Sequence, residues 1–176
     1  NNNDYVKVND TFVNENKEVF ICGKTKDASG NVVAFVAKLS ATGVKEWEKT
    51  LELGTGQQEA EFLKLVVDGS AVWVVGQNRP NSSILADYNP DIILAKYTQA
   101  DNGLSATLTF QKGYAGISGS TRGDVVTSLV KYSDTRFLIG GFTNTNSASP
   151  EDAFLASIDT SGNFSVKRKF ASANKS

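Results

Sequence analysis

The sequence contains no histidine, no methionine and a single cysteine among its 176 residues. Without histidine, the chain cannot build a Ser-His-Asp or Cys-His catalytic arrangement, or an imidazole-ligated zinc site, from its own residues. One cysteine excludes an internal disulfide, and Cys22 stands in the apolar run VFICG, where we expect a small buried hydrophobic residue. The chemistry that remains uses carboxylates, Lys or Tyr side chains, or oxygen-ligated metal ions.

The chain also lacks a charge imbalance and long apolar runs. A net charge of -1 gives no electrostatic basis for binding nucleic acid or an anionic membrane, and the basic cluster at 167–169 is too small to change this. No apolar run approaches the roughly 20 residues that span a bilayer. The chain starts with NNNDY, without Met or a signal-like segment, so we expect a processed piece or an excised segment.

The sequence does contain an internal repeat of about sixty residues. Three apolar runs, VFICGKT, VWVVGQN and FLIGGFT, each end in Gly followed by polar residues. After each run come a polar loop, an alternating segment with a shared alanine, a short turn and a third strand. After the first two units a fourth strand follows. The shared alanines are Ala37, Ala95 and Ala156.

These patterns predict β-strands throughout. The first run of each unit is almost wholly apolar, as expected for a strand buried on both faces, whereas the second and third alternate. We therefore expect Phe20, Val74 and Leu138 in innermost strands, with Trp47 on a third strand. A Gly at matching places in the three innermost runs indicates close approach of another backbone. These glycines are Gly23, Gly76 and Gly141.

Four antiparallel strands repeated at a fixed spacing are typical of a β-propeller blade. The segments GKT…VAFVAKLSATGVKEWEKTL and GGFT…EDAFLASIDTSGN resemble the bacterial seven-bladed propeller repeat called the SBBP repeat. The resemblance is strong in two units; the middle unit keeps Asp91 at the acidic position but has Ile92 and Ile93 in place of the small-aromatic pair. The resemblance implies the fold and hardly any activity, because its motif consists of packing and turn residues. It also implies a secreted or cell-surface location, where most members of that family lie.

The predicted fold is therefore an all-β, propeller-like arc of about three four-stranded blades, in one segment covering 1–176. Closed propellers typically have about four to eight blades, so we expect an arc that is part of a larger propeller or is completed by oligomerisation. In the second case residues 4–13 of one copy would pair beside residues 163–170 of another. The division expected along the chain is an outer strand at 4–13, unit one at 19–68, unit two at 71–134 and unit three at 136–170.

The predicted connections are unequal, and the long ones emerge at one end of the strands. Recognition residues are often found on such loops, held by a rigid scaffold, although tolerated polar insertions would look the same. Exposed aromatic and polar side chains in these loops are the candidates for stacking on a sugar ring or anchoring a protein. The candidates are Arg79, Tyr88, Tyr114, Arg122 and Asn144.

Two further motifs use carboxylates. Asp87, Asn89 and Asp91 alternate in DYNPD, which makes calcium the one candidate cofactor, but the run lacks the Gly and Glu of an EF-hand loop and Asn-Pro turn chemistry explains it equally well. Glu59 with Glu61, and Glu151 with Asp152, could form catalytic pairs, yet such carboxylates on a strand edge are ordinarily solvated.

The sequence thus favours a non-catalytic binding or structural scaffold of a secreted or cell-surface protein, with a glycan or a protein as its partner and further propeller blades from the same or another chain. No catalytic residue and no nucleic-acid partner are assigned. The alternative is part of a propeller hydrolase or lyase that acts on carbohydrate through carboxylates.

Overall fold

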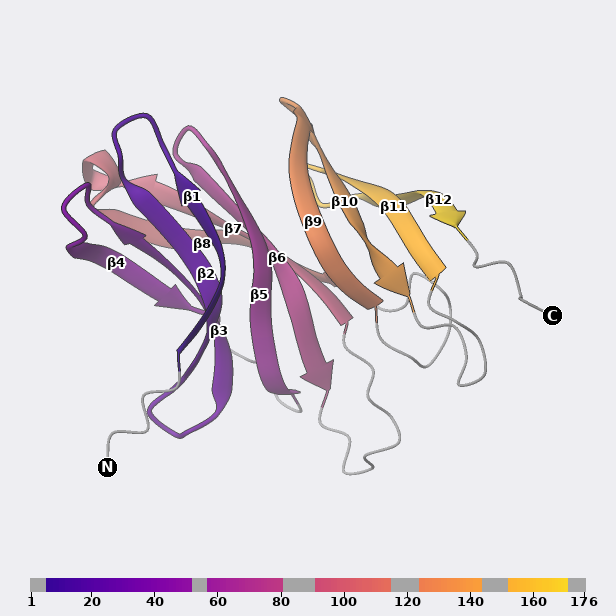
Figure 1. The fold of residues 1–176 in the computed structure, drawn as a ribbon, viewed down its shortest axis with the longest axis horizontal. Helices are drawn as coiled ribbons and strands as arrows, with labels where there is room; N and C mark the ends of the chain where they lie inside the picture. Colours follow the sequence, from indigo (N-terminus) through magenta and orange to yellow (C-terminus); the bar gives the residue numbers. More distant parts are fainter. Residues whose placement is uncertain (1–5, 52–56, 81–90, 115–123, 144–151, 171–176) are drawn as a thin grey trace.

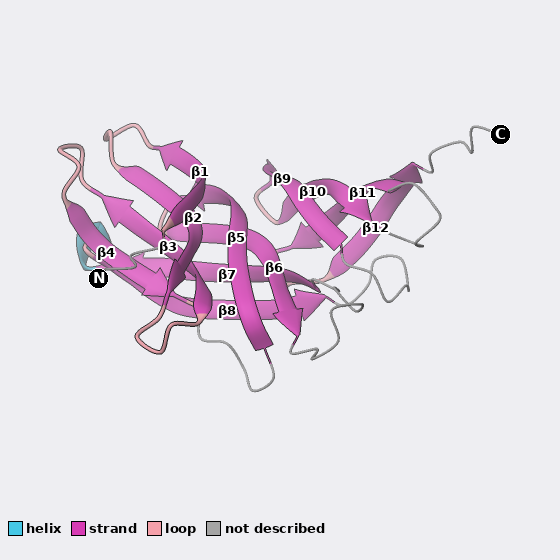
Figure 2. Ribbon diagram, turned by 60° about the horizontal axis from the view of Figure 1, so that its bottom comes forward, coloured by secondary structure: helices cyan, strands magenta, loops and turns pink. Residues whose placement is uncertain are grey.

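The computed structural model describes residues 6–51, 57–80, 91–114, 124–143 and 152–170. Within these ranges the chain folds almost entirely into strands, with one 3-10 turn and no α-helix (Figure 2). This confirms the expected all-β class, and each expected strand is found at its expected place. The elements are β1 (Lys7–Val13), β2 (Val19–Lys26), β3 (Val32–Leu39), β4 (Lys45–Thr50), β5 (Gln57–Asp68), β6 (Ala71–Pro80), β7 (Asp91–Ala100), η1 (Asp101–Gly103), β8 (Ser105–Tyr114), β9 (Asp124–Ser133), β10 (Arg136–Thr143), β11 (Asp152–Asp159) and β12 (Phe164–Phe170).

Local chemistry sets the hairpin turns. In the β11–β12 turn, the Asp159 carboxylate accepts hydrogen bonds from the backbone N–H groups of Ser161 and Asn163, at 2.9 and 2.8 Å. These bonds, led by the one from Asn163, hold the pKa of Asp159 below its usual value. Gly162 follows with a φ of 77°, a conformation that glycine adopts without a steric penalty.

The strands pair in chain order as three antiparallel meanders, which we call blade 1 (β1–β4), blade 2 (β5–β8) and blade 3 (β9–β12). A single parallel bridge between Val32 and Glu59 joins blades 1 and 2 into one eight-stranded sheet, whereas blade 3 is a separate sheet. Among the first strands, β5 lies between β1 and β9 and contacts both, and the blades fan out from them (Figure 1). The arrangement is a propeller-like arc, without a closed ring in the described part of the chain.

The sequence-based division into units is wrong by one strand. Residues 60–68 and 124–134 were expected to end units one and two, but β5 pairs with β6 and β9 pairs with β10, so each begins a blade. Likewise, β1 pairs with β2 and is the first strand of blade 1, so it is not the outer strand of a preceding blade. Phe20, Val74 and Leu138 therefore lie on second strands, one step out from the centre.

Two apolar cores lie between the blades. The first lies between blades 1 and 2 and contains Phe20 and Trp47 from blade 1 with Val74 from blade 2. The second lies between blades 2 and 3 and contains Trp73 and Phe137 from the two sides. Blade 2 is thus covered on both faces, which explains why the centre of β6 reads as a continuous apolar run.

The repeated glycines lie where the first strand of each blade bulges. Register shifts between Val8 and Asp10, between Phe62 and Lys64, and opposite Gly141 mark these bulges. A Cβ added to Gly76 would collide with the carbonyl oxygen of Glu61 and lie 2.7 Å from the Cα of Phe62. The expected close backbone approach is confirmed, but the neighbouring backbone belongs to the same blade.

Candidate functional site

The longest connections leave the arc at one end. They join Pro80 to Asp91, Tyr114 to Asp124 and Thr143 to Asp152, whereas the opposite end has turns such as the one between Asp68 and Ala71. Because consecutive strands are antiparallel, the strand ends that carry the long connections face the same way (Figure 1). We call this side of the arc the loop end.

Most of the binding candidates expected from the sequence lie outside the described residues. Arg79 and Asp91 lie in strands β6 and β7, but their side chains are not among those described. The remaining candidates outside the described ranges are Tyr88, Arg122 and Asn144, together with the calcium candidates Asp87 and Asn89 and the carboxylate Glu151.

Tyr114 differs from its expected position. It was expected in a loop with an exposed ring, but β8 extends to this residue, and its side chain is half-buried. The ring packs against Phe164 with a centroid distance of 5.0 Å, and the hydroxyl donates a hydrogen bond to the Gly162 carbonyl at 2.7 Å. Burial, with a smaller contribution from the Asp159 carboxylate, raises the pKa of Tyr114 to about 12. This tyrosine holds blades 2 and 3 together.

Strands β1, β2 and β5 bring five polar side chains together, which we call the inner-strand ion cluster: Lys7, Asn9, Lys24, Glu59 and Glu61. Glu61 accepts from Lys7 Nζ at 3.0 Å and from Asn9 Nδ2 at 2.8 Å. Lys24 Nζ lies 3.1 Å from Glu59 Oε1 and 3.3 Å from Glu61 Oε2. Glu59 and Glu61 point to the same side because they alternate along β5.

The electrostatics of this cluster hold both signs of charge in place. Burial by itself raises the pKa of Glu61, but hydrogen bonds from Lys7 and Asn9 and the Lys24 ammonium outweigh it, so that pKa lies below its usual value. Burial likewise lowers the pKa of Lys24, and its two carboxylate partners more than reverse the effect. Two carboxylates and two ammonium groups thus form a network with no formal net charge.

The sequence alone indicates two of the five residues of this cluster. Glu59 and Glu61 were noticed as alternating carboxylates, whereas Lys7, Asn9 and Lys24 come from strands 35 to 54 residues away in the chain. No local pattern marks them, since their role depends on β1 and β2 packing against β5. The expectation that these carboxylates are solvated is also corrected, because Glu61 is only 7% exposed.

A second polar group lies at the loop end between blades 2 and 3. Thr143 and Asp124 are opposite each other in the β10–β9 register, and both side chains are buried. Asn78, at the end of β6, is also buried. The Asn78 Oδ1 and Thr143 Oγ1 atoms find no hydrogen-bond partner among the described residues. Buried acceptors without a donor are costly, so these strand ends mark a place where an added donor would be stabilising.

The described residues form neither a reactive thiol site nor a metal site. Cys22 is completely buried, and burial raises the pKa of its thiol, as expected for a hydrophobic core residue. Among the described residues, no group of three or more His, Cys, Asp and Glu side chains could hold a metal ion. No helix in those residues has the length and apolar character to cross a membrane.

Comparisons with known proteins give little more. No family model and no curated protein matches this chain. One solved structure that is similar to it is the crystal structure of a thermostable family-43 glycoside hydrolase, with a TM-score of 0.46 and 13% sequence identity. That match covers 94% of this chain and 53% of the other, so this chain spans about half the length of that neighbour.

Proposed function

We propose that this chain is a non-catalytic binding scaffold, in which stacked blades present the loop end to a partner. The observation that carries the proposal is the contrast between the two sides of the arc. Two buried cores and tight hairpins fix the strands, while the three longest connections leave the loop end beside Asn78 and Thr143. A rigid frame with long connections at one end is a common arrangement for recognition.

The inner-strand ion cluster favours binding over carbohydrate hydrolysis or lysis. A hydrolase that uses two carboxyl groups needs one of them protonated at its working pH. Here the pKa of Glu61 is lowered, and both Glu59 and Glu61 are engaged by Lys24. This pair is therefore suited to hold β1 and β2 against β5 and is poorly suited to donate a proton.

The proposal includes a location and an assembly. The SBBP-type resemblance of the repeats supports a secreted or cell-surface protein. The half-buried Ile21 on the outer face of blade 1 and the exposed Ser165 on that of blade 3 support further blades as neighbours. The partner at the loop end is a glycan or a protein, and calcium remains the one ion that residues 87–91 would suit.

The test uses a printed array of immobilised glycans and a matching panel of extracellular proteins. Wild-type protein is compared with a variant in which residues 82–89 are replaced by a Gly-Ser linker of equal length. The control variant carries the same kind of replacement at residues 41–42, at the opposite end of the arc. We expect one class of target to be retained by the wild type and the control and lost by the 82–89 variant.

The same glycans are assayed for release of reducing ends. Sugar release that disappears in Glu59→Gln or Glu61→Gln would overturn the proposal in favour of the enzyme alternative. Equal binding by the 82–89 variant, with an unchanged melting temperature, would show that the loop end is not the recognition surface.

A further inference from the structure

The junction between blades 1 and 2 depends on a row of three side chains across blade 1. Phe20, Lys38 and Trp47 are direct neighbours in the strand register. The rings of Phe20 and Trp47 lie 6.2 Å apart, and Lys38 Nζ lies 5.8 Å from the Phe20 centroid. The carbonyl of Gly103, in the β7–β8 turn of blade 2, accepts from Trp47 Nε1 at 3.1 Å and from Lys38 Nζ at 3.0 Å. Blade 1 thus binds a turn glycine of blade 2.

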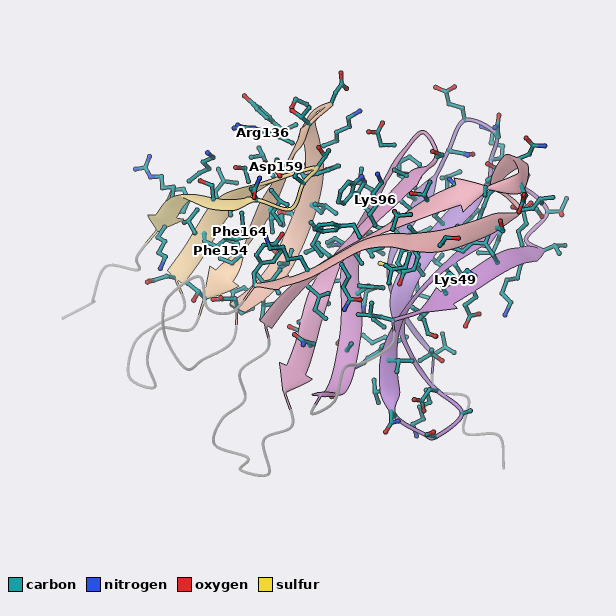
Figure 3. All side chains as sticks on the ribbon, turned by 180° about the vertical axis from the view of Figure 1, so that it is seen from behind. Lys49, Lys96, Arg136, Phe154, Asp159 and Phe164 are labelled. Carbon is teal, nitrogen blue, oxygen red and sulfur yellow. The ribbon has the colours of Figure 1, made fainter. Side chains whose placement is uncertain are left out.

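The junction between blades 2 and 3 repeats this arrangement. Trp73, Lys96 and Phe110 form the row at the same register. The ring centroids of Trp73 and Phe110 lie 6.0 Å apart, and Lys96 Nζ lies 5.3 Å from the Trp73 ring centroid. The row faces the β11–β12 turn, where the Phe110 ring packs so closely on Gly162 that an added Cβ would collide with it. The Gly162 carbonyl accepts from Tyr114 at 2.7 Å. Figure 3 labels Lys96 in blade 2 and Phe154 and Phe164 in blade 3.

Each junction therefore has a donor half and an acceptor half. The donor half is an aromatic–lysine–aromatic row on one blade, although at the second junction the Gly162 carbonyl accepts from Lys112 and Tyr114 of β8 and the row contributes the packing of Phe110. The acceptor half is a glycine with positive φ in the turn between the third and fourth strands of the next blade, at 88° for Gly103 and 77° for Gly162. The positive φ keeps this position free of a side chain, so the row of the neighbouring blade can approach the turn closely.

Blade 1 has an acceptor half that no described residue occupies. Gly43 lies in its β3–β4 turn with a φ of 81°, and its N–H donates to the Ser40 carbonyl at 2.9 Å, as Gly162 donates to Asp159. A Cβ added to Gly43 would meet nothing within 4 Å among the described residues. The turn thus has the geometry of the Gly162 turn, and no row among the described residues lies against it.

The sheet face beside Gly43 also matches the faces that are buried in the other blades. Ile21 pairs with Ala37 in blade 1 at the position where Val74 pairs with Ala95 and Ile139 with Ala156. In blades 2 and 3 these residues are completely buried against the preceding blade, whereas Ile21 is half-buried. Ile21 and Ala37 line an open groove of about 120 Å³ on this face together with Phe35 and Leu39.

Blade 3, at the other end of the arc, lacks an aromatic–lysine–aromatic row. In blade 3 the row reads Leu138, Ser157 and Ser165, without an aromatic ring or a lysine. Leu138 is half-buried and Ser165 is exposed on the outer face of blade 3. A second copy of this chain therefore does not offer the row that Gly43 would accept, which argues against simple head-to-tail pairing of identical copies.

We propose that the outer face of blade 1 is a docking surface for a four-stranded β-blade that carries an aromatic–lysine–aromatic row. The row inserts against Gly43, and its blade covers the half-buried Ile21. The occupant is defined by this chemistry, because the two occupied junctions of the same molecule show what the face accepts. The inference rests on the part of the proposed function that gives this arc further blades as neighbours, and it is independent of what the loop end binds.

The test restores the missing row on blade 3. Leu138→Phe, Ser157→Lys and Ser165→Trp are combined with Ile21→Lys, so that this chain presents a row but has a blocked blade 1 face. It is immobilised, and wild-type protein is passed over it to measure a dissociation constant by interferometry. We expect binding at least about tenfold tighter than to immobilised Ile21→Lys protein without the row, as one additional buried hydrogen bond of about 1.4 kcal/mol would give.

The specificity control uses analytes with a blocked face. Ile21→Lys or Val19→Lys in the analyte should abolish the gain, because both side chains lie on the proposed docking face. If the triple row lowers the melting temperature, Ser165→Trp alone, at an exposed position, serves as the immobilised row and should give part of the gain. Binding that is equal with and without the row, or that survives both blocked analytes, would overturn the proposal.

Discussion

At the scale of single residues, the glycine at the end of each apolar run allows the first two strands of its blade to approach closely. Gly23, Gly76 and Gly141 each lie beneath a backbone carbonyl of the bulged first strand, from Lys7, Glu61 and Val125 respectively. A side chain here would have to displace a strand in a close-packed interior, which a β-sheet tolerates poorly. The sequence pattern found these positions because the same glycine recurs at the same point of each unit.

Gly76→Val is expected to lower the free energy of unfolding by at least about 3 kcal/mol, since its Cβ would collide with the Glu61 carbonyl. The matched control is Gly113→Val in β8, where an added Cβ meets nothing within 4 Å and the strand conformation suits valine. Urea unfolding of both variants checks the prediction. An unfolding midpoint for Gly76→Val equal to that of Gly113→Val would show that the close contact is absent.

Glu61 gives the fold a dependence on pH. Its pKa in the folded protein lies below its ordinary value of 4.5, so its contribution to stability is present above that pH and is lost as the pH falls through the folded pKa. We expect the urea concentration at the unfolding midpoint to decrease when the pH is lowered below about 5. Glu61→Gln should lower that midpoint at pH 7 and make it depend less on pH in acid. Identical acid profiles for the two proteins would contradict this role of the cluster.

At the scale of strands, the sequence was sufficient to place every strand but could not decide how they are grouped. Alternation and apolar runs report whether a segment is half or fully buried, which is a local property. β5 joins β6 through a two-residue turn, with Asp68 opposite Ala71. That β5 begins a blade depends on its packing against the first strand of blade 1, as in the hydrogen bond from Asn9 to the Phe62 carbonyl at 2.7 Å, between residues 53 positions apart. A continuous apolar run predicts a strand buried on both faces, which suits an innermost strand. Blade stacking produces the same run in β6, because residues of β6 lie in both apolar cores.

The revised grouping predicts unequal effects from two deletions of equal length. Deleting residues 1–13 removes β1, which pairs with β2 and whose Asp10 carboxylate accepts from the Leu65 N–H of β5 at 3.0 Å. Deleting residues 164–176 removes β12, an edge strand whose residues from Ser165 to Phe170 are exposed. We expect the first deletion to lower the melting temperature by roughly 10 °C or more and the second by only a few degrees.

Thermal unfolding followed by circular dichroism makes this comparison. The earlier assignment of residues 4–13 as an outer strand predicts the reverse, with the N-terminal deletion affecting assembly and hardly affecting the fold. A smaller loss for the 1–13 deletion than for the 164–176 deletion would restore that assignment.

At the scale of the whole molecule, the described strands form a stack of three blades in which the middle blade has an apolar core on each face. The candidate site was harder to predict than the stack, because it depends on this packing. Tyr114 was expected to be free for a ligand, and instead its hydroxyl and ring are used at the junction with blade 3. Conversely, the partners of Glu61 could not be found from the sequence, since they come from another blade.

Amide hydrogen exchange measured by mass spectrometry tests the stacked arc most directly. Because amides deep in the stack exchange only when it opens, the account predicts the slowest exchange in β6 and β7 of blade 2, with β4 and β12 at the outer edges exchanging first. Exchange in β6 and β7 as fast as in β12, or the strongest protection in blade 1 or blade 3, would contradict the stack of three blades.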